Sequence, residues 1–328
     1  MGKRRTNNGR STEFRDLGFG TSIGKQTRRL INTDGSFNVV RTGGGLGSWS
    51  LYQYLITISW WEFSFWVTTV FILFNSLFAF LYMLVGVEHL TGAPLDAYDA
   101  SLRFLNEFGH AFYFSVQTFT TVGYGSISPI GHAASMLSAF ESMFGLLAFA
   151  LATGVLYGRF SRPSVKIRFS KHAIISPYRK TNSFQFRIVN RRQNQLIELE
   201  VTVVLMKYER KGKDVRQKFY PLKLERNRVA LFPLTWTIVH PINEESPLFM
   251  MTPEQLKETN AEFLILIKGY DDTFAQMVHD RMSYKADDVL FGARFVSAFY
   301  TDKKGNLVME VNKVDLCERA ELNVPVVQ

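Results

Sequence analysis

The chain has 328 residues, a formal net charge of +9 and a mean hydropathy close to zero. These averages fit a soluble protein, but the apolar residues are concentrated in two long stretches. The single cysteine, Cys317, excludes a disulfide within the chain. The histidines and acids show no spacing typical of a metal site or a catalytic triad, so the sequence predicts a protein that is not an enzyme and has no cofactor.

The chain begins with a polar segment that has no features of a secretory signal peptide. Residues 1–47 show no apolar periodicity and end in a glycine-rich run, which predicts a flexible cytoplasmic tail. Residues 48–60 begin with Ser48, a residue that can cap a helix, and continue with aromatic and aliphatic residues at helical spacing. We expect a short slide helix along the inner membrane interface, or alternatively an N-terminal extension of the first span.

Two segments are long and apolar enough to cross a bilayer. No charged residue occurs from Phe63 to Val87, and a helix of this length reaches about 37 Å, enough for a hydrocarbon core of about 30 Å. An outer helix is therefore predicted over about residues 61–87, and an inner helix over about residues 133–159. Both belong to a predicted two-span pore module, residues 61–162.

Charge next to the spans predicts their orientation. Basic residues crowd just after the second span, while the loop between the spans carries mostly acids, which places both termini in the cytoplasm. Anionic lipid headgroups explain such basic residues better than nucleic acid does, so no nucleic-acid partner is expected. The predicted lipid-binding residues are Arg159, Arg162 and Lys166.

The segment between the spans contains the main candidate functional residues. A pore helix over about residues 107–119 enters the membrane without crossing it, and a non-helical segment follows. That segment, the predicted selectivity filter, is Thr120, Thr121, Val122, Gly123, Tyr124 and Gly125. Backbone at this depth must line water or be buried in protein, because carbonyl groups that face lipid without a partner are costly. The alternative is a turn that connects two buried helices.

The glycines of this segment explain how it could hold an ion. Gly123 and Gly125 tolerate positive φ, which lets successive carbonyl groups point the same way. Backbone carbonyls of Thr121, Val122, Gly123 and Tyr124 would then replace the hydration shell of K⁺. One copy of the segment supplies one quarter of each carbonyl ring, and no internal repeat supplies the rest. A homotetramer of identical subunits is therefore expected.

The remainder of the chain has the sequence pattern of β-strands instead of helices. In residues 163–328, short β-branched and aromatic segments alternate with turn residues. Residues 183–189 and 197–203 alternate between apolar and polar positions. No glycine-rich phosphate loop follows any of these segments, so we predict an antiparallel β-sandwich rather than a nucleotide-binding α/β fold. The expected fold class is a membrane α module joined to a cytoplasmic all-β domain.

Four further motifs accompany the filter. They are Arg159–Pro163, Phe169–Ile174, Arg187–Asn190 and His240–Leu248. With these motifs the chain resembles the prokaryotic inward-rectifier potassium channels of the KirBac family, over nearly all of its length from Trp49. The resemblance implies a slide helix, a two-span pore and an immunoglobulin-like cytoplasmic sandwich, in a K⁺ channel of the cell inner membrane. A membrane-anchored ligand sensor with a non-conducting pore is the alternative function.

The resemblance also implies candidate gates. Tyr157 matches the aromatic residue that narrows the pore where inner helices converge, and Gly145 matches a proposed bending point in that helix. An aromatic residue here could instead be an interfacial anchor. The loop from Gly269 to Met277 matches a second constriction in the cytoplasmic pore, or is a plain hairpin turn.

Several residues near the filter depart from the family pattern. Gln117 stands where the family usually has glutamate, and Ile127 where eukaryotic members have arginine, so the ion pair that braces the filter in those members cannot form. Glu141 is the only acid in the second span. We expect it close to the filter or protonated, in a bracing role, because a buried intramembrane carboxylate is costly.

Other departures concern rectification and lipid. Phe149 occupies the rectification-control position, where strong rectifiers have an acid, and Lys268 replaces a cytoplasmic acid that in relatives helps to hold polyamines, although Glu198 is retained. These changes argue against strong rectification. The eukaryotic phosphoinositide site uses arginines that flank a tryptophan at the start of the first span, but this chain has Trp60, Trp61 and Glu62 there. Phosphoinositide is therefore not expected to activate the channel.

Overall fold

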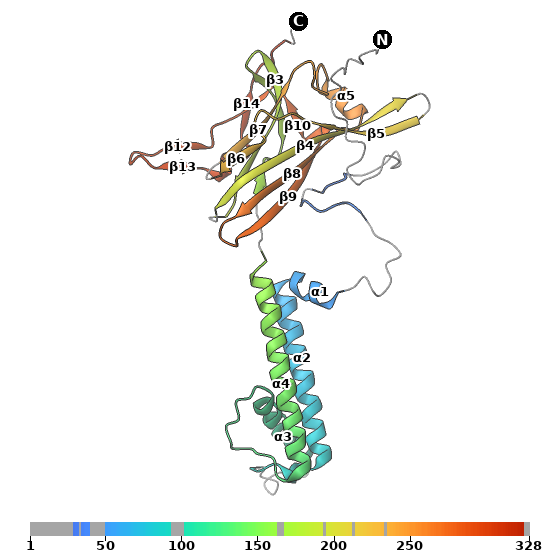
Figure 1. Cartoon of the computed structure of the whole chain (residues 1–328), viewed down its shortest axis with the longest axis vertical. Coiled ribbons are helices and arrows are strands. Elements are labelled where there is room, and N and C mark those ends of the chain that lie inside the picture. Colours follow the sequence, from blue (N-terminus) through green and yellow to red (C-terminus); the bar gives the residue numbers. More distant parts are fainter. Residues whose placement is uncertain are drawn as a thin grey trace, which may run out of the picture. The chain divides into compact units, whose positions relative to one another are not determined.

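The structure is a computed structural model in which two compact units can be described, each by itself (Figure 1). One unit is Gly43–Arg162, and the other combines Met1–Thr42 with Pro163–Gln328. The described residues are 29–32, 34–39, 50–92, 102–162, 167–192, 195–211, 214–232 and 235–324. Lys166, the predicted glycine-rich link and most of the predicted tail lie outside them.

The first unit begins with two separate helices. Helix α1 spans Leu51–Thr57, and Ser50 caps it by accepting a hydrogen bond from the Gln53 N–H, so the cap lies two residues after the predicted Ser48. Helix α2 spans Trp60–Val85 and starts with a capping box formed by Ser59 and Glu62. Ile58 and Ser59 between the helices have extended backbone. Because of this break, α1 is not a continuous extension of the first span.

Three more helices are described in this unit. A short 3₁₀ helix, η2, spans Val87–His89; α3 spans Arg103–Phe119 and α4 spans Gly131–Phe160. Helix α3 starts four residues before the predicted residue 107. Arg103 Nε donates to Glu107 Oε1 at 2.8 Å, an i,i+4 ion pair that supports the additional turn. Among the described residues, α2 and α4 are the two helices long and apolar enough to cross a membrane.

The second unit is a sandwich of two sheets, as predicted. One sheet contains β1 (Ile167–Phe169), β3 (Thr181–Asn190), β2 (Ala173–Tyr178) and β10 (Val289–Phe291), with β7 (Thr235–Ile242) also on β3. The other contains β5 (Asp214–Pro221), β4 (Leu196–Lys211), β8 (Glu262–Asp271) and β9 (Gln276–Lys285), with β6 (Arg228–Leu231) also on β4. The strand pairs are antiparallel except for β10 with β2, which is parallel and departs from the prediction.

Smaller elements decorate the sandwich. Strand β11 (Ala293–Phe295) pairs with β14 (Cys317–Arg319), and β12 (Phe299–Thr301) pairs with β13 (Leu307–Met309). The short helices are α5 (Pro253–Glu258), η3 (Ala286–Asp288) and η4 (Val311–Asp315). The core lies between the sheets, where the Phe184 ring of one sheet stacks on the Phe263 ring of the other with centroids 4.1 Å apart.

The predicted alternation holds better for one strand than for the other. In β4, Leu199, Val201 and Val203 are buried while Glu200 and Thr202 are exposed. In β3 two positions on the polar side of the predicted pattern, Ser183 and Arg187, are buried as well, and Gln185 is half-buried. Arg187 on that side donates to the Val296 carbonyl at 2.8 Å and lies over the Phe295 ring, so another part of the chain covers it.

The His240–Leu248 motif covers the end of β7 and the turn that follows it. His240 is buried, its Nε2 lies 2.8 Å from Ser246 Oγ and its Nδ1 lies 2.7 Å from the Lys223 carbonyl. Burial lowers the pKa of His240, which favours the neutral ring. Since a carbonyl oxygen only accepts, Nδ1–H donates to Lys223 and Nε2 accepts from the Ser246 hydroxyl. The motif therefore has a structural role.

Candidate ion-conduction site

The backbone of the predicted filter alternates in conformation. Thr121, Gly123 and Gly125 have φ of 58°, 52° and 80°, whereas Val122 and Tyr124 between them do not have positive φ. Positive φ at every second residue turns successive carbonyl groups toward the same side of the chain. The glycines were expected to do this. Thr121 was not, and its Cβ makes this conformation costly, as is often found at functional sites.

The end of the pore helix holds the filter directly. The Gln117 carbonyl accepts hydrogen bonds from the N–H of Val122 at 2.9 Å and of Gly123 at 3.3 Å. Among the described residues, the buried Gln117 Oε1 has no hydrogen-bond partner. Ile127 packs at the edge of an apolar cluster that joins α2 and α3. Backbone contacts from α3 thus stand in place of the ion pair that Gln117 and Ile127 cannot make.

Glu141 lies behind the pore helix, among three helices. It is fully buried, and Tyr82 Oη of α2 donates to its Oε2 at 2.7 Å. Its Oε1 is hydrogen-bonded to Ser115 Oγ of α3, which also lies 3.1 Å from Asn75 Oδ1 of α2. The sequence predicted Glu141 close to the filter or protonated, but it missed the two direct partners, Tyr82 and Ser115, and Asn75 behind Ser115. Asn75 could have been suspected, because polar residues inside an apolar span are usually functional.

Gly145 allows a close contact between α4 and the end of α3. A Cβ atom at Gly145 would lie 2.1 Å from the Phe119 carbonyl oxygen. Any larger residue would therefore push against the backbone that immediately precedes the filter. Helix α4 is continuous from Gly131 to Phe160 in this structure. The observed function of this glycine is close packing, and bending remains a prediction.

Several large apolar side chains of the pore unit are exposed in the single chain. Tyr124 of the filter and, on α4, Phe149 and Tyr157 are all more than 70 % exposed. Large apolar side chains exposed together mark a surface that other protein chains or lipid cover. The two α4 residues are the predicted gate, Tyr157, and the predicted rectification-control position, Phe149.

Arg159 does not project toward lipid as predicted. Its Nη2 donates to the Ile58 carbonyl at 2.9 Å, and its Nη1 donates to the Leu55 carbonyl. The guanidinium group also lies over the Trp60 and Phe63 rings, 4.5 and 4.6 Å from their centroids. The charge is thus engaged with the carbonyl end of α1 and the start of α2. This leaves the exposed Arg162 as the described candidate for a lipid contact, while Lys166 lies outside the described residues.

The predicted cytoplasmic constriction is a hairpin. Gly269 lies inside β8 and is paired with Val278 of β9, so the turn covers only residues 272–275. Asp271 Oδ1 accepts from the Thr273 N–H at 3.0 Å and fixes this turn. Residues 269–277 therefore form a hairpin, and a constriction of the pore by this hairpin stays a prediction.

The retained acid Glu198 has a basic partner. It occupies a bulge in β4 with φ of 52°, and Arg228 Nη2 lies 3.0 Å from its Oε1. Lys268 stands between Glu200 of β4 and His279 of β9 in the sheet register. Glu198 and Glu200 therefore each have a basic neighbour, which reduces the negative potential available to a polyamine.

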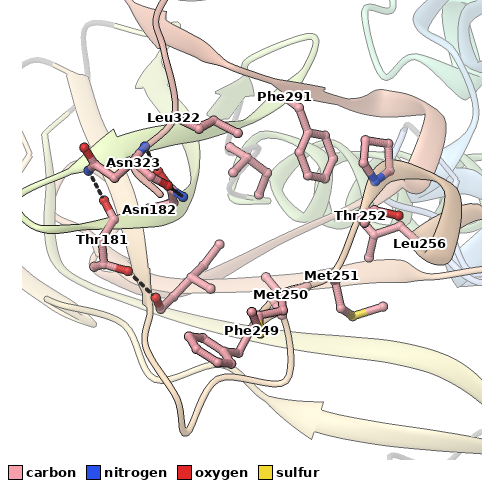
Figure 2. Close-up of a pocket in the computed structure, with 14 residues that line it drawn as sticks. Thr181, Asn182, Phe249, Met250, Met251, Thr252, Leu256, Phe291, Leu322 and Asn323 are labelled. Carbon is pink, nitrogen blue, oxygen red and sulfur yellow. Dashed lines mark hydrogen bonds between the residues drawn. The ribbon is translucent and has the colours of Figure 1, made fainter. Parts of the chain in front are cut away.

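A separate cavity of about 320 Å³ lies in the cytoplasmic unit. Figure 2 shows apolar side chains around it, including Phe249, Met251 and Phe291. Asn182 Nδ2 donates to the Asn323 carbonyl, and the Asn323 N–H donates to Asn182 Oδ1, both at 2.9 Å, which ties the C-terminal segment to β3. None of the described residues that line the cavity has a titratable side chain, so it offers no acid–base group.

Comparison with known proteins agrees with this geometry. Residues 167–327 match the family described as inward rectifier potassium channel C-terminal domain, and residues 68–162 match the family described as ion channel. Inward rectifier potassium channel Kirbac3.1 of Paramagnetospirillum magnetotacticum is 35% identical over 288 residues, which cover 87% of this chain and 94% of that protein. Inward rectifier potassium channel 4 of Rattus norvegicus and of Homo sapiens are each 29% identical over 224 residues, half of their own length. The chain belongs to the inward rectifier potassium channel family.

Proposed function

We propose that this chain is one subunit of a homotetrameric channel that conducts K⁺ passively across the cell inner membrane, with both termini in the cytoplasm. The observation that carries the proposal is the filter segment 120–125, in which alternate residues have positive φ and the end of a pore helix holds the backbone between two spans. Four copies would bring the carbonyl groups of Thr121, Val122, Gly123 and Tyr124 into rings around one axis. Such rings replace the hydration shell of K⁺.

Flux into liposomes tests this function. Liposomes that contain the purified protein should take up ⁸⁶Rb⁺ when they are loaded with K⁺ but not when they are loaded with the same concentration of Na⁺. Ba²⁺ should block the uptake. The native mass, corrected for detergent, should equal that of four 37.6 kDa chains. Equal permeability to K⁺ and Na⁺ would contradict the filter assignment, and a mass of one or two chains would contradict the assembly.

We expect Tyr157→Ala to raise the initial ⁸⁶Rb⁺ flux several-fold in channels that are mostly closed at rest. The Tyr157 ring is exposed near the end of α4, and a ring of four such side chains would close the pore by excluding water. Leu151→Ala is a matched control, because Leu151 is equally exposed on the same helix but lies about 120° around it. Unchanged flux in a Tyr157→Ala tetramer would show that Tyr157 is not the gate and would leave the hairpin at residues 272–275 as the candidate.

We also expect anionic lipid to support flux through Arg162. A basic residue near an anionic surface contributes about 1 kcal/mol, so Arg162→Gln should raise the anionic lipid content that half-maximal flux requires. Arg159→Gln should instead lower flux at every lipid composition, because that side chain joins α1, α2 and α4.

Phosphoinositide added to anionic liposomes should not raise the ⁸⁶Rb⁺ flux of the channel. A phosphoinositide-driven rise in flux that disappears in Arg162→Gln would contradict this.

A further inference from the structure

A hydrogen-bonded chain of four polar side chains, called the network below, lies inside the membrane unit. Asn75 and Tyr82 come from α2, Ser115 from α3 and Glu141 from α4, and each is at most 1% exposed. None of the ion pairs found among the described residues involves Glu141. A carboxylate buried without a cation is costly. Glu141 must therefore be stabilised by the hydrogen bonds of the network.

The orientation of the Asn75 amide group fixes one end of the network. Asn75 Nδ2 donates to the Phe71 carbonyl at 2.7 Å. Because a carbonyl oxygen can only accept, the amide nitrogen must face Phe71 and Oδ1 must face Ser115. Asn75 Oδ1 thus needs a hydrogen from Ser115 Oγ, which lies 3.1 Å away.

The number of hydrogens in the network determines the protonation state of Glu141. The network has three contacts: Ser115 with Asn75, Ser115 with Glu141, and Tyr82 with Glu141. The Ser115 and Tyr82 hydroxyl groups supply one hydrogen each, and an ionised carboxylate supplies none. An ionised Glu141 would leave one of the three contacts without a hydrogen. A proton on Glu141 Oε1 completes all three.

We propose that Glu141 is a neutral carboxylic acid in the assembled channel and that its proton is a structural part of the support behind the filter. Glu141 Oε1–H donates to Ser115, Ser115 donates to Asn75, and Tyr82 donates to Glu141 Oε2. Glu141 is a positioning residue, since it acts on the filter only through α3. Its link to the filter continues from Ser115 along the last turn of α3 to the Gln117 carbonyl, which accepts from Val122 and Gly123.

Glu141→Gln separates the proton from the negative charge. A glutamine amide offers one N–H to Ser115 and an oxygen to Tyr82, as the neutral acid does in nearly the same shape, and it adds a second N–H. This variant should keep ⁸⁶Rb⁺ flux and Ba²⁺ block within about twofold of the unsubstituted channel, since each of the three contacts keeps a hydrogen and the second amide N–H is the only donor added. Glu141→Ala and Ser115→Ala leave buried groups without partners and should lower flux about tenfold or more.

Infrared spectroscopy of the purified tetramer detects the proton itself. The carbonyl stretch of a protonated carboxylic acid should be present at neutral pH and should disappear in Glu141→Gln. It should remain in Glu88→Gln, a control that removes an exposed carboxyl group from the same unit. The spectrum needs only the folded tetramer, so the proposal can be tested even if Glu141→Ala fails to assemble.

Two results would overturn the proposal. One is an infrared difference between the unsubstituted channel and Glu141→Gln that shows an ionised carboxylate instead of an acid. The other is a Glu141→Gln flux as low as that of Glu141→Ala. The positioning role rests on the proposed conduction, but the proton does not: an unsubstituted protein with the acid band and no ⁸⁶Rb⁺ flux would refute the channel function and leave the neutral acid standing.

Discussion

Replacing Gly145 by alanine is expected to abolish K⁺ flux and to destabilise the tetramer. The new Cβ would lie 2.1 Å from the Phe119 carbonyl oxygen and 2.8 Å from its carbon. Both are backbone atoms, so no side chain can turn away to make room. Overpacking of this kind typically costs about 1–3 kcal/mol, and four subunits would bear it at once. The displaced residue immediately precedes the filter, which is why we expect flux to suffer together with stability.

Gly154→Ala is the matched control for this prediction. Gly154 lies on the same helix, and a Cβ there would meet no atom within 4 Å in the single chain. Alanine also favours a helix over glycine by about 1 kcal/mol, so this variant should be at least as stable as the unsubstituted channel. The measurements are ⁸⁶Rb⁺ uptake and the thermal unfolding midpoint. A Gly145→Ala channel that conducts normally would show that α4 does not contact the end of α3 in the working tetramer.

The membrane spans and the filter could be predicted because their signals are local. A long apolar run and a glycine-containing segment between two such runs need no knowledge of distant residues. The role of Arg159 could not be predicted in the same way. Its contacts with Leu55 and Ile58 join residues about a hundred positions apart, and they depend on where α1 ends relative to α4. A basic residue at a membrane exit was therefore assigned to lipid on charge alone.

Packing among several elements explains the other differences. A lone acid in the second span predicted that Glu141 was special, but its partners on α2 and α3 depend on how three helices meet. In the cytoplasmic unit, alternation predicted β4 as a strand but not its bulge next to Glu198, which shifts the register between Ile197 and Glu200. Pattern alone likewise missed the cover over Arg187, because the covering residues, Phe295 and Val296, follow more than a hundred positions later.

The filter backbone leads to the second large expected effect, which is loss of selectivity in Gly123→Ala. Gly123 has φ of 52°, and a Cβ there would meet no atom within 4 Å in the single chain, so the cost arises from the backbone conformation alone. For a residue with a Cβ this conformation costs about 1–2 kcal/mol, or about 4–8 kcal/mol over four subunits. Relaxation to negative φ would relieve the strain but would turn a carbonyl group away from the axis.

Gly305→Ala provides the matched backbone control for Gly123→Ala. Gly305 has φ of 84° in the turn between β12 and β13, and a Cβ there also meets nothing within 4 Å. It should carry a similar local strain without any change in ion selectivity. We expect Gly123→Ala to assemble as a tetramer, to lose the preference for K⁺ over Na⁺ and to take up ⁸⁶Rb⁺ at least about tenfold more slowly, the factor that about 1.4 kcal/mol in one subunit would give. If Gly123→Ala stayed selective, positive φ at this position would not be needed to aim the carbonyl groups, and the alternating backbone could not be the basis of K⁺ coordination.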